Sequence, residues 1–149
     1  MRAEDQYHVG IVVEDIDAAK TQLSDLFGYV WGTEMSTNVM VRLGSGTEEV
    51  NLRLVYSVSE PRVELVQQIE GTVWKPAPGS GVHHIGYWSD DVTTDAAQLE
   101  ARGFLHEASG LGPDGVPMWG YYRSPTGPRV ELVSRALQAG MATLWTRQG

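Results

Sequence analysis

The sequence predicts an α+β fold. Two tandem βαβββ modules are expected to form one curved, mixed but mainly antiparallel eight-stranded sheet with the helices outside. The first observation behind this prediction is an internal repeat: residues 8–11 (HVGI) recur as residues 84–87 (HIGY), and residues 61–66 (PRVELV) recur unchanged as residues 128–133. The second is the order of patterns in each copy, in which alternating apolar residues come first, then helical spacing, then further alternating segments. A chain of 149 residues is long enough for one domain built from two such modules.

The first module is predicted over residues 6–67. Apolar side chains alternate with other residues from His8 to Val13, which is the period of a strand. Asp15 is then the expected N-cap of a helix that ends at Gly28, a residue type common at helix C-termini. Further strands are expected at residues 38–43, 50–56 and 62–67, with turns at residues 44–47 and 57–61.

The second module is predicted over residues 82–134 and repeats this order. Asp91 is the expected helix N-cap, and Gly103 is expected to follow the helix. Strands are expected at residues 103–108, 118–123 and 129–134. Residues 68–81 include a stretch rich in proline and glycine and are interpreted as the linker, and residues 135–149 as a C-terminal helix or tail.

The composition excludes several classes of protein. A net charge of −8 argues against binding to a phosphate backbone. The absence of cysteine excludes disulfides, thiolate metal sites and a cysteine nucleophile. No apolar run approaches the length of about 18 residues that spans a bilayer, and the first residues contain no apolar signal region. We therefore expect a cytoplasmic protein with neither a nucleic-acid nor a membrane partner.

Each copy of the repeat carries one histidine on its first strand and one glutamate on its last. Because side chains alternate between the faces of a strand, His8, His84, Glu64 and Glu131 should all point away from the apolar layer beneath the helices. If the modules pair about a pseudo-twofold axis, the four side chains converge, and such a set suits divalent Ni, Co, Zn, Mn or Fe. A single strand histidine more often bonds a backbone carbonyl, and a single glutamate more often faces solvent. The metal site is favoured because all four positions are equivalent in the repeat.

Three further residues on the same strand faces are candidates for lining a substrate site. Gly10 and Gly86 are expected to leave room for a ligand above the metal. Trp88 shares the face of His84 and either lines the cleft or packs in the core. His83 falls on the opposite face by the same alternation, so we interpret it as structural.

With these motifs the chain resembles the vicinal oxygen chelate superfamily, which includes glyoxalase I, methylmalonyl-CoA epimerase, extradiol dioxygenases and bleomycin-binding proteins. The resemblance spans residues 7–134 and is carried by YHVGIVVEDID, GVHHIGY and the two RVELV segments. It implies paired modules around one divalent metal and a small-molecule substrate. It also implies that the metal ligands are His8, Glu64, His84 and Glu131.

The ligand set resembles that of glyoxalase I most directly, whereas the layout is closer to methylmalonyl-CoA epimerase. The resemblance implies a metal-dependent lyase or isomerase that acts on a small α-oxygenated carbonyl compound or thioester through a metal-stabilised enolate. Glu131, with Glu64 as its counterpart, would transfer the proton. The epimerases often carry glutamine where this chain has Glu64, and they use an acid on the third strand, where residues 51–57 offer none.

Two alternatives to this function stay open. One is a metal-free protein that binds or sequesters an antibiotic-type small molecule, and the other is an Fe(II) extradiol-type dioxygenase. An exposed sheet edge on each module further predicts a homodimer. The site is then completed either within one chain or between two, because relatives do both.

Overall fold

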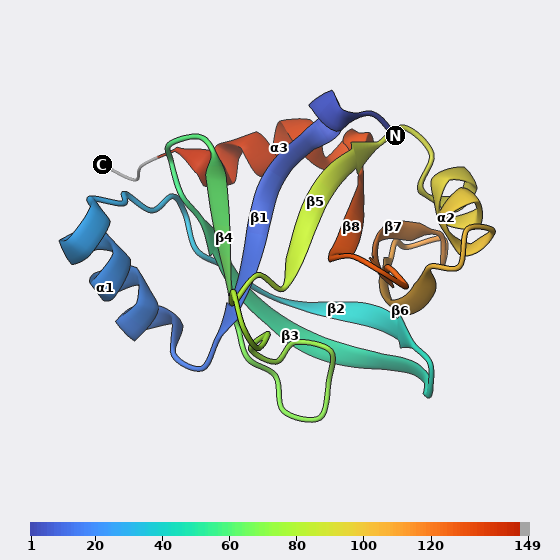
Figure 1. The fold of residues 1–149 in the computed structure, drawn as a ribbon, viewed down its shortest axis with the longest axis horizontal. Helices are drawn as coiled ribbons and strands as arrows, with labels where there is room; N and C mark the ends of the chain where they lie inside the picture. Colours follow the sequence, from blue (N-terminus) through green and yellow to red (C-terminus); the bar gives the residue numbers. More distant parts are fainter. Residues whose placement is uncertain (147–149) are drawn as a thin grey trace.

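The computed structural model describes residues 1–146, and its eight strands close into one barrel (Figure 1). The first module contains β1 (Gln6–Val13), α1 (Ile16–Phe27), β2 (Met35–Leu43), β3 (Gly46–Tyr56) and β4 (Arg62–Gln67). The second contains β5 (His84–Ser89), α2 (Val92–Glu100), β6 (Leu105–Leu111), β7 (Pro117–Arg123) and β8 (Arg129–Ser134). The predicted fold class, with its two βαβββ modules, is therefore confirmed.

Short helical segments flank the modules. The segment η1 (Ala3–Asp5) precedes β1, and three segments follow β8: η2 (Arg135–Leu137), α3 (Gln138–Ala142) and η3 (Thr143–Trp145). The C-terminal helix predicted over residues 135–149 is thus three short pieces, and residues 147–149 lie outside the described residues. No helix within residues 1–146 is long and apolar enough to cross a membrane. The exact boundaries of modules and linker stay predictions.

The strand order around the barrel is β1-β4-β3-β2-β6-β7-β8-β5. The pairs β1–β4 and β5–β8 are parallel and the remaining pairs are antiparallel, so the sheet is mixed and mainly antiparallel. The two modules meet twice, because β1 pairs with β5 and β2 pairs with β6. These pairings cover the module edges that were expected to be exposed. The homodimer therefore loses the argument on which it rested and stays a prediction.

The helix ends are fixed by the residues that the sequence indicates. The Asp15 side chain accepts a hydrogen bond from the Ala18 amide at 2.9 Å, and Asp91 does the same for the Thr94 amide at 3.0 Å. Gly28 ends α1 in the left-handed region, with φ of 73°, where a side chain would be strained. The second helix differs, because α2 already ends at Glu100.

Apolar side chains form one core inside the barrel and a smaller core beneath each of the helices α1 and α2. The interior core includes Val41, Leu52 and Val66. Outside, α1 packs Ile16 on β3 and β4, and α2 packs on β7 and β8. Figure 1 shows these two helices on opposite sides of the strands, with α3 lying across β4, β1 and β5 in this view. The barrel interior is thus separated from both outer helices.

Candidate metal centre

The four candidate ligands come from four adjacent strands, β4, β1, β5 and β8. Backbone register brings them to one level of the barrel. Gly10 pairs with both Glu64 and His84, and Gly86 pairs with both Glu131 and His8. The duplicated sequence therefore places two equivalent histidine–glutamate pairs around the line where the modules meet. All four side chains are buried, with at most 7% of any residue exposed.

The donor atoms of these side chains face one another. The two histidine Nε2 atoms are 2.9 Å apart. His8 Nε2 lies 3.1 Å from Glu131 Oε2 and 3.5 Å from Glu64 Oε2. His84 Nε2 lies 3.0 Å from Glu64 Oε2 and 3.4 Å from Glu131 Oε2. These separations define one compact group of two nitrogen and two oxygen atoms, all within 4.8 Å of one another.

These distances fit a divalent metal ion. Around an ion about 2.1 Å from each ligand, neighbouring donor atoms lie about 3.0 Å apart at octahedral angles and about 3.4 Å apart at tetrahedral angles. Within residues 1–146, Glu64 Oε2 and Glu131 Oε2 are buried and accept no well-formed hydrogen bond. Buried carboxylate oxygens without donors are costly unless something else neutralises them. The group formed by His8, Glu64, His84 and Glu131 could therefore hold a divalent ion.

Without a metal, the two histidines and the two glutamates shift one another's pKa values. Burial by itself lowers the pKa of His8, but the carboxylates of Glu64 and Glu131 outweigh burial and raise that pKa to about 9. The pKa of His84 is raised for the same reason. Burial by itself raises the pKa of Glu64 and Glu131, but the two imidazoles outweigh it and hold both values below the usual range. The directions of these pKa shifts show that the imidazoles and the carboxylates stabilise each other's charged forms.

The two strand glycines have a different role from the one predicted. A Cβ atom on Gly86 would lie 1.9 Å from His8 Cε1, and one on Gly10 would lie 1.9 Å from His84 Cε1. The space beside each glycine is thus filled by the imidazole of the opposite strand. Gly10 and Gly86 make room for the ligands themselves, and neither contributes to the interior cavity described below.

Trp88 also lies away from the interior cavity. Its ring stacks on Tyr7 with centroids 3.9 Å apart, and it lines a separate, open depression that Tyr7 and His8 also border. Only 4% of Trp88 is exposed, so it packs as a core residue.

The side on which His83 lies differs from the prediction. Because it precedes β5, it does not follow the strand alternation: its Nδ1 lies 3.0 Å from His84 Nδ1 and its Nε2 lies 2.8 Å from the Val73 carbonyl oxygen. His83 therefore positions the His84 ring, as a structural residue on the same side as the ligands.

Sequence reasoning missed the tyrosines around the centre. Tyr7 lies at an irregularity in the β1–β5 pairing, which turns its ring inward beside His8 with centroids 4.3 Å apart. Tyr56 and Tyr121 approach His8 and His84 with ring centroids 5.5 Å and 4.9 Å away. Burial, followed by the nearby glutamates, raises the pKa of all three phenols well above the usual value, so they remain protonated hydrogen-bond donors. For Tyr56 the strand alternation of β3 was an available signal, whereas nothing in the sequence marks the irregularity at Tyr7.

A cavity of about 240 Å³ adjoins the centre inside the barrel. Glu64 and Glu131 form part of its wall, and the rest is mostly aromatic and aliphatic. Leu137, Met141 and Leu144 of the C-terminal segment close it on one side. A small molecule in this cavity would touch both glutamates.

The comparisons with known proteins agree with this architecture. Residues 7–115 match the family model described as the Glyoxalase/Bleomycin resistance protein/Dioxygenase superfamily. This match covers more than half of the chain, and the protein belongs to that superfamily, as the sequence motifs predicted. No curated protein matches the chain.

Solved structures with a similar fold include methylmalonyl-CoA epimerases. The Mycobacterium tuberculosis epimerase superposes with a TM-score of 0.60 at 19% identity, over 93% of this chain and 92% of that one. A variant of the Streptomyces coelicolor epimerase in complex with 2-nitronate-propionyl-CoA gives 0.59 at 21% identity, over 89% and 94% of the two chains. A hypothetical protein from Bacillus halodurans gives 0.54 at 16% identity, over 87% and 93%. At these identities the likeness shows the fold alone.

Proposed function

We propose that this protein is a divalent-metal-dependent lyase or isomerase of the glyoxalase type, acting on a small α-oxygenated carbonyl compound or thioester. The observation that carries the proposal is the contact between two features. Four buried donor atoms form a compact group, and two of the residues that supply them, Glu64 and Glu131, also line the interior cavity. A binding protein needs the cavity alone, whereas proton chemistry beside a carbonyl group needs both.

The chemistry divides between the metal and the chain. A divalent ion in this site would act as a Lewis acid that stabilises negative charge on a substrate oxygen. The chain supplies the base: a carboxylate oxygen of Glu131 or Glu64, facing the cavity, accepts the proton from the carbon beside the carbonyl and returns it. His8 and His84 are held by the packing of their rings against Gly86 and Gly10, and the mainly apolar wall limits the water beside the glutamates.

The two alternatives are less well supported. A sequestering protein has no need for two histidines and two glutamates whose buried donor atoms converge on one point. An extradiol-type dioxygenase uses two histidines and one carboxylate, so a fourth ligand at Glu64 would occupy a position that oxygen or substrate requires. Oxygen consumption with a catechol and Fe(II) would identify the dioxygenase.

Exchange of a substrate proton with solvent tests the proposal. Metal-loaded protein in D₂O is incubated with hydroxyacetone and with 2-hydroxyacetophenone, and deuterium at the carbon beside the carbonyl is followed by NMR. We expect exchange with at least one of the two compounds, abolished in Glu131→Gln or Glu64→Gln and retained in Glu48→Gln, whose side chain is exposed on β3. Exchange no faster than with metal-free protein, for both compounds, would count against the proposal.

A further inference from the structure

The cavity beside Glu64 and Glu131 has a mainly apolar wall. Aromatic rings of Trp74, Trp119 and Tyr121 form one side of it, with ring centroids 5.6 to 6.0 Å from one another. Aliphatic side chains from β2, β3, β4, β8 and the C-terminal segment form most of the remainder. Such a wall favours an apolar substituent, because burying apolar surface against aromatic and aliphatic side chains is favourable.

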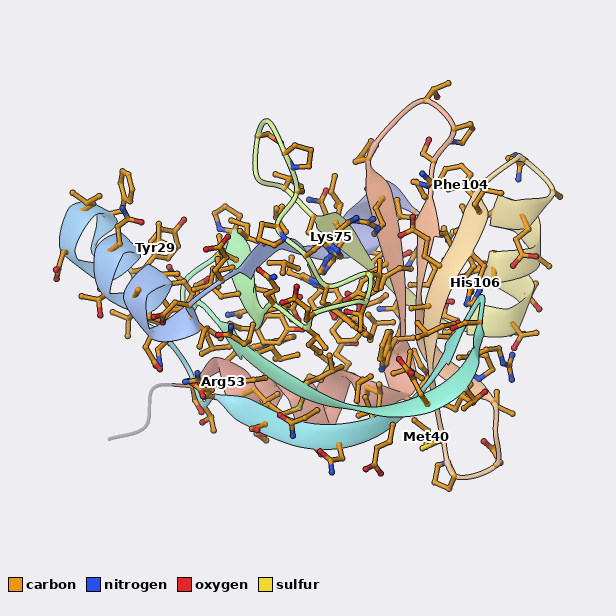
Figure 2. All side chains as sticks on the ribbon, turned by 90° about the horizontal axis from the view of Figure 1, so that it is seen from below. Tyr29, Met40, Arg53, Lys75, Phe104 and His106 are labelled. Carbon is orange, nitrogen blue, oxygen red and sulfur yellow. The ribbon has the colours of Figure 1, made fainter. Side chains whose placement is uncertain are left out.

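Within residues 1–146, the cavity has no lysine or arginine in its wall. Arg62 donates its hydrogen bonds to the Ser57 and Val58 carbonyl oxygens, and Lys75 is exposed on the linker (Figure 2). A substrate carboxylate would lie beside two glutamates, whose charges already balance a divalent ion, with no lysine or arginine in the wall to neutralise it. Burial of such an unpaired charge is strongly unfavourable.

The C-terminal segment covers the cavity and is fixed at several points. The Thr33 amide donates to the Leu144 carbonyl oxygen at 3.0 Å, and Arg135 forms a 2.6 Å ion pair with Asp5. The Arg62 guanidinium lies 4.3 Å from the centre of the Trp145 ring. The cavity of about 240 Å³ has no space for the long arm of a coenzyme A thioester, which would have to lie outside it. Its size is that of a whole small molecule.

The volume sets the size of that molecule. An engineered apolar cavity of about 150 Å³ is known to bind benzene. The difference between 240 and 150 Å³ is about 90 Å³, which is roughly the share of three water molecules in the liquid. A six-membered ring together with a two- or three-atom oxygenated group therefore fits. Tyr7 Oη, which is buried and has no hydrogen-bond partner within residues 1–146, is available to the oxygenated group.

We propose that the substrate of this site is an uncharged, free α-oxygenated carbonyl compound that carries one aromatic or branched apolar substituent. A malonyl-type thioester, with its carboxylate and its coenzyme A arm, does not fit this cavity. The inference rests on the proposed function, because the glutamates at the cavity wall act on the oxygenated end while the aromatic wall holds the substituent.

Three hydroxamates test which substituent the cavity prefers. All three present the same two adjacent oxygen atoms to Co(II)-loaded protein and differ only in the substituent. We expect isothermal titration to show that benzohydroxamate binds about 10- to 100-fold more tightly than acetohydroxamate, as burial of one aromatic ring predicts. The monohydroxamate of malonic acid should bind no more tightly than acetohydroxamate. The proposal would be overturned if benzohydroxamate bound no better than acetohydroxamate, or if the malonic derivative bound best.

A variant that fills the cavity and a control variant outside it test the position of the substituent. Val39 lines the cavity from β2, whereas its neighbour Met40 is exposed and points away from the barrel (Figure 2). Val39→Phe should weaken benzohydroxamate at least 10-fold and leave acetohydroxamate nearly unchanged, and Met40→Phe should alter neither. The comparison of the three hydroxamates on wild-type protein needs no variant, so the test stands even if Val39→Phe fails to fold.

Metal-free protein separates this inference from the proposed function. Benzyl alcohol should quench tryptophan fluorescence in the metal-free wild type, because Trp74 and Trp119 line the cavity, and it should bind more weakly to Val39→Phe. If benzyl alcohol binds in this way while Co(II) is not taken up, the apolar ring site stands and only the proposed function fails. If benzyl alcohol does not bind, the ring site is wrong.

Discussion

The substitution Gly86→Ala tests how the fold positions a metal ligand. The new Cβ would lie 1.9 Å from His8 Cε1 and 2.3 Å from Nδ1, whereas ordinary contact begins near 3.4 Å. The His8 ring must therefore move by about 1.5 Å, three times the tolerance of about 0.5 Å within which a functional site works. We expect metal affinity to fall about 100-fold or more, which is about 2.8 kcal/mol, together with an overpacking cost of about 1–3 kcal/mol in unfolding.

Metal titration and urea unfolding of the same samples would measure both effects. Gly44→Ala is the matched control: a Cβ on Gly44 meets nothing within 4 Å, and its φ is not in the left-handed region. The control should bind metal like the wild type. If Gly86→Ala folds and also binds metal with unchanged affinity, His8 is not held as a ligand in the way described.

Three further predictions concern protons, core packing and the C-terminal cover. Burial lowers the pKa of His8, but the carboxylates beside this histidine outweigh burial and raise that pKa to about 9. Metal binding at pH 7 should therefore release at least one proton, which calorimetry in buffers of different ionisation enthalpy would measure. Metal binding without proton release would contradict the site. Because the folded pKa lies above the unfolded value of 6.5, the metal-free protein should also lose stability as the pH rises from 6.5 to about 9. Trp74→Ala should lower the free energy of unfolding by about 3–5 kcal/mol, because Trp74 is fully buried, and Trp74→Phe should lower it less. Equal stability of Trp74→Ala and wild type would refute this packing. Arg135→Gln removes the ion pair that fixes the C-terminal segment to Asp5. Hydrogen exchange at the Thr33 amide, which donates to this segment, should become faster. Unchanged exchange would show that the ion pair does not hold the segment over the cavity.

Much of the candidate metal centre follows from the sequence because two short-range rules suffice. The repeat places a histidine and a glutamate at equivalent positions of each module, and strand alternation fixes the face on which each side chain lies. The structure brings all four together because the register of β1 is regular from His8 to Gly10, where it pairs with β4 and β5, and that of β5 is regular where it pairs with β8.

Other features depend on contacts between distant segments. Alternation predicts that strands exist, but it does not say that β2 pairs with β6 and closes the barrel. The pairing irregularity at Tyr7 breaks the alternation, so the inward turn of that ring could not be predicted. The glycines beside the histidines were assigned to substrate space because the sequence does not show which ring the opposite strand brings.

The C-terminal cover carried a signal that sequence reasoning did not use. Leu137, Met141 and Leu144 have the i, i+4, i+7 spacing of one helical face. In the structure this face closes the cavity, although the backbone is divided into three short helical pieces. The apolar face predicts that the segment packs on something, while the identity of its partner comes only from the fold.

Metal content is the most direct test of the account. Wild-type protein, Glu131→Ala and the control Glu48→Ala are exposed separately to Ni, Co, Zn, Mn and Fe(II), desalted, and analysed by mass spectrometry. The four-residue centre predicts about one ion per chain for at least one metal in wild type and control, and a small fraction of that in Glu131→Ala. A wild-type protein that takes up none of the five metals, or a Glu131→Ala protein that retains full occupancy, would contradict it.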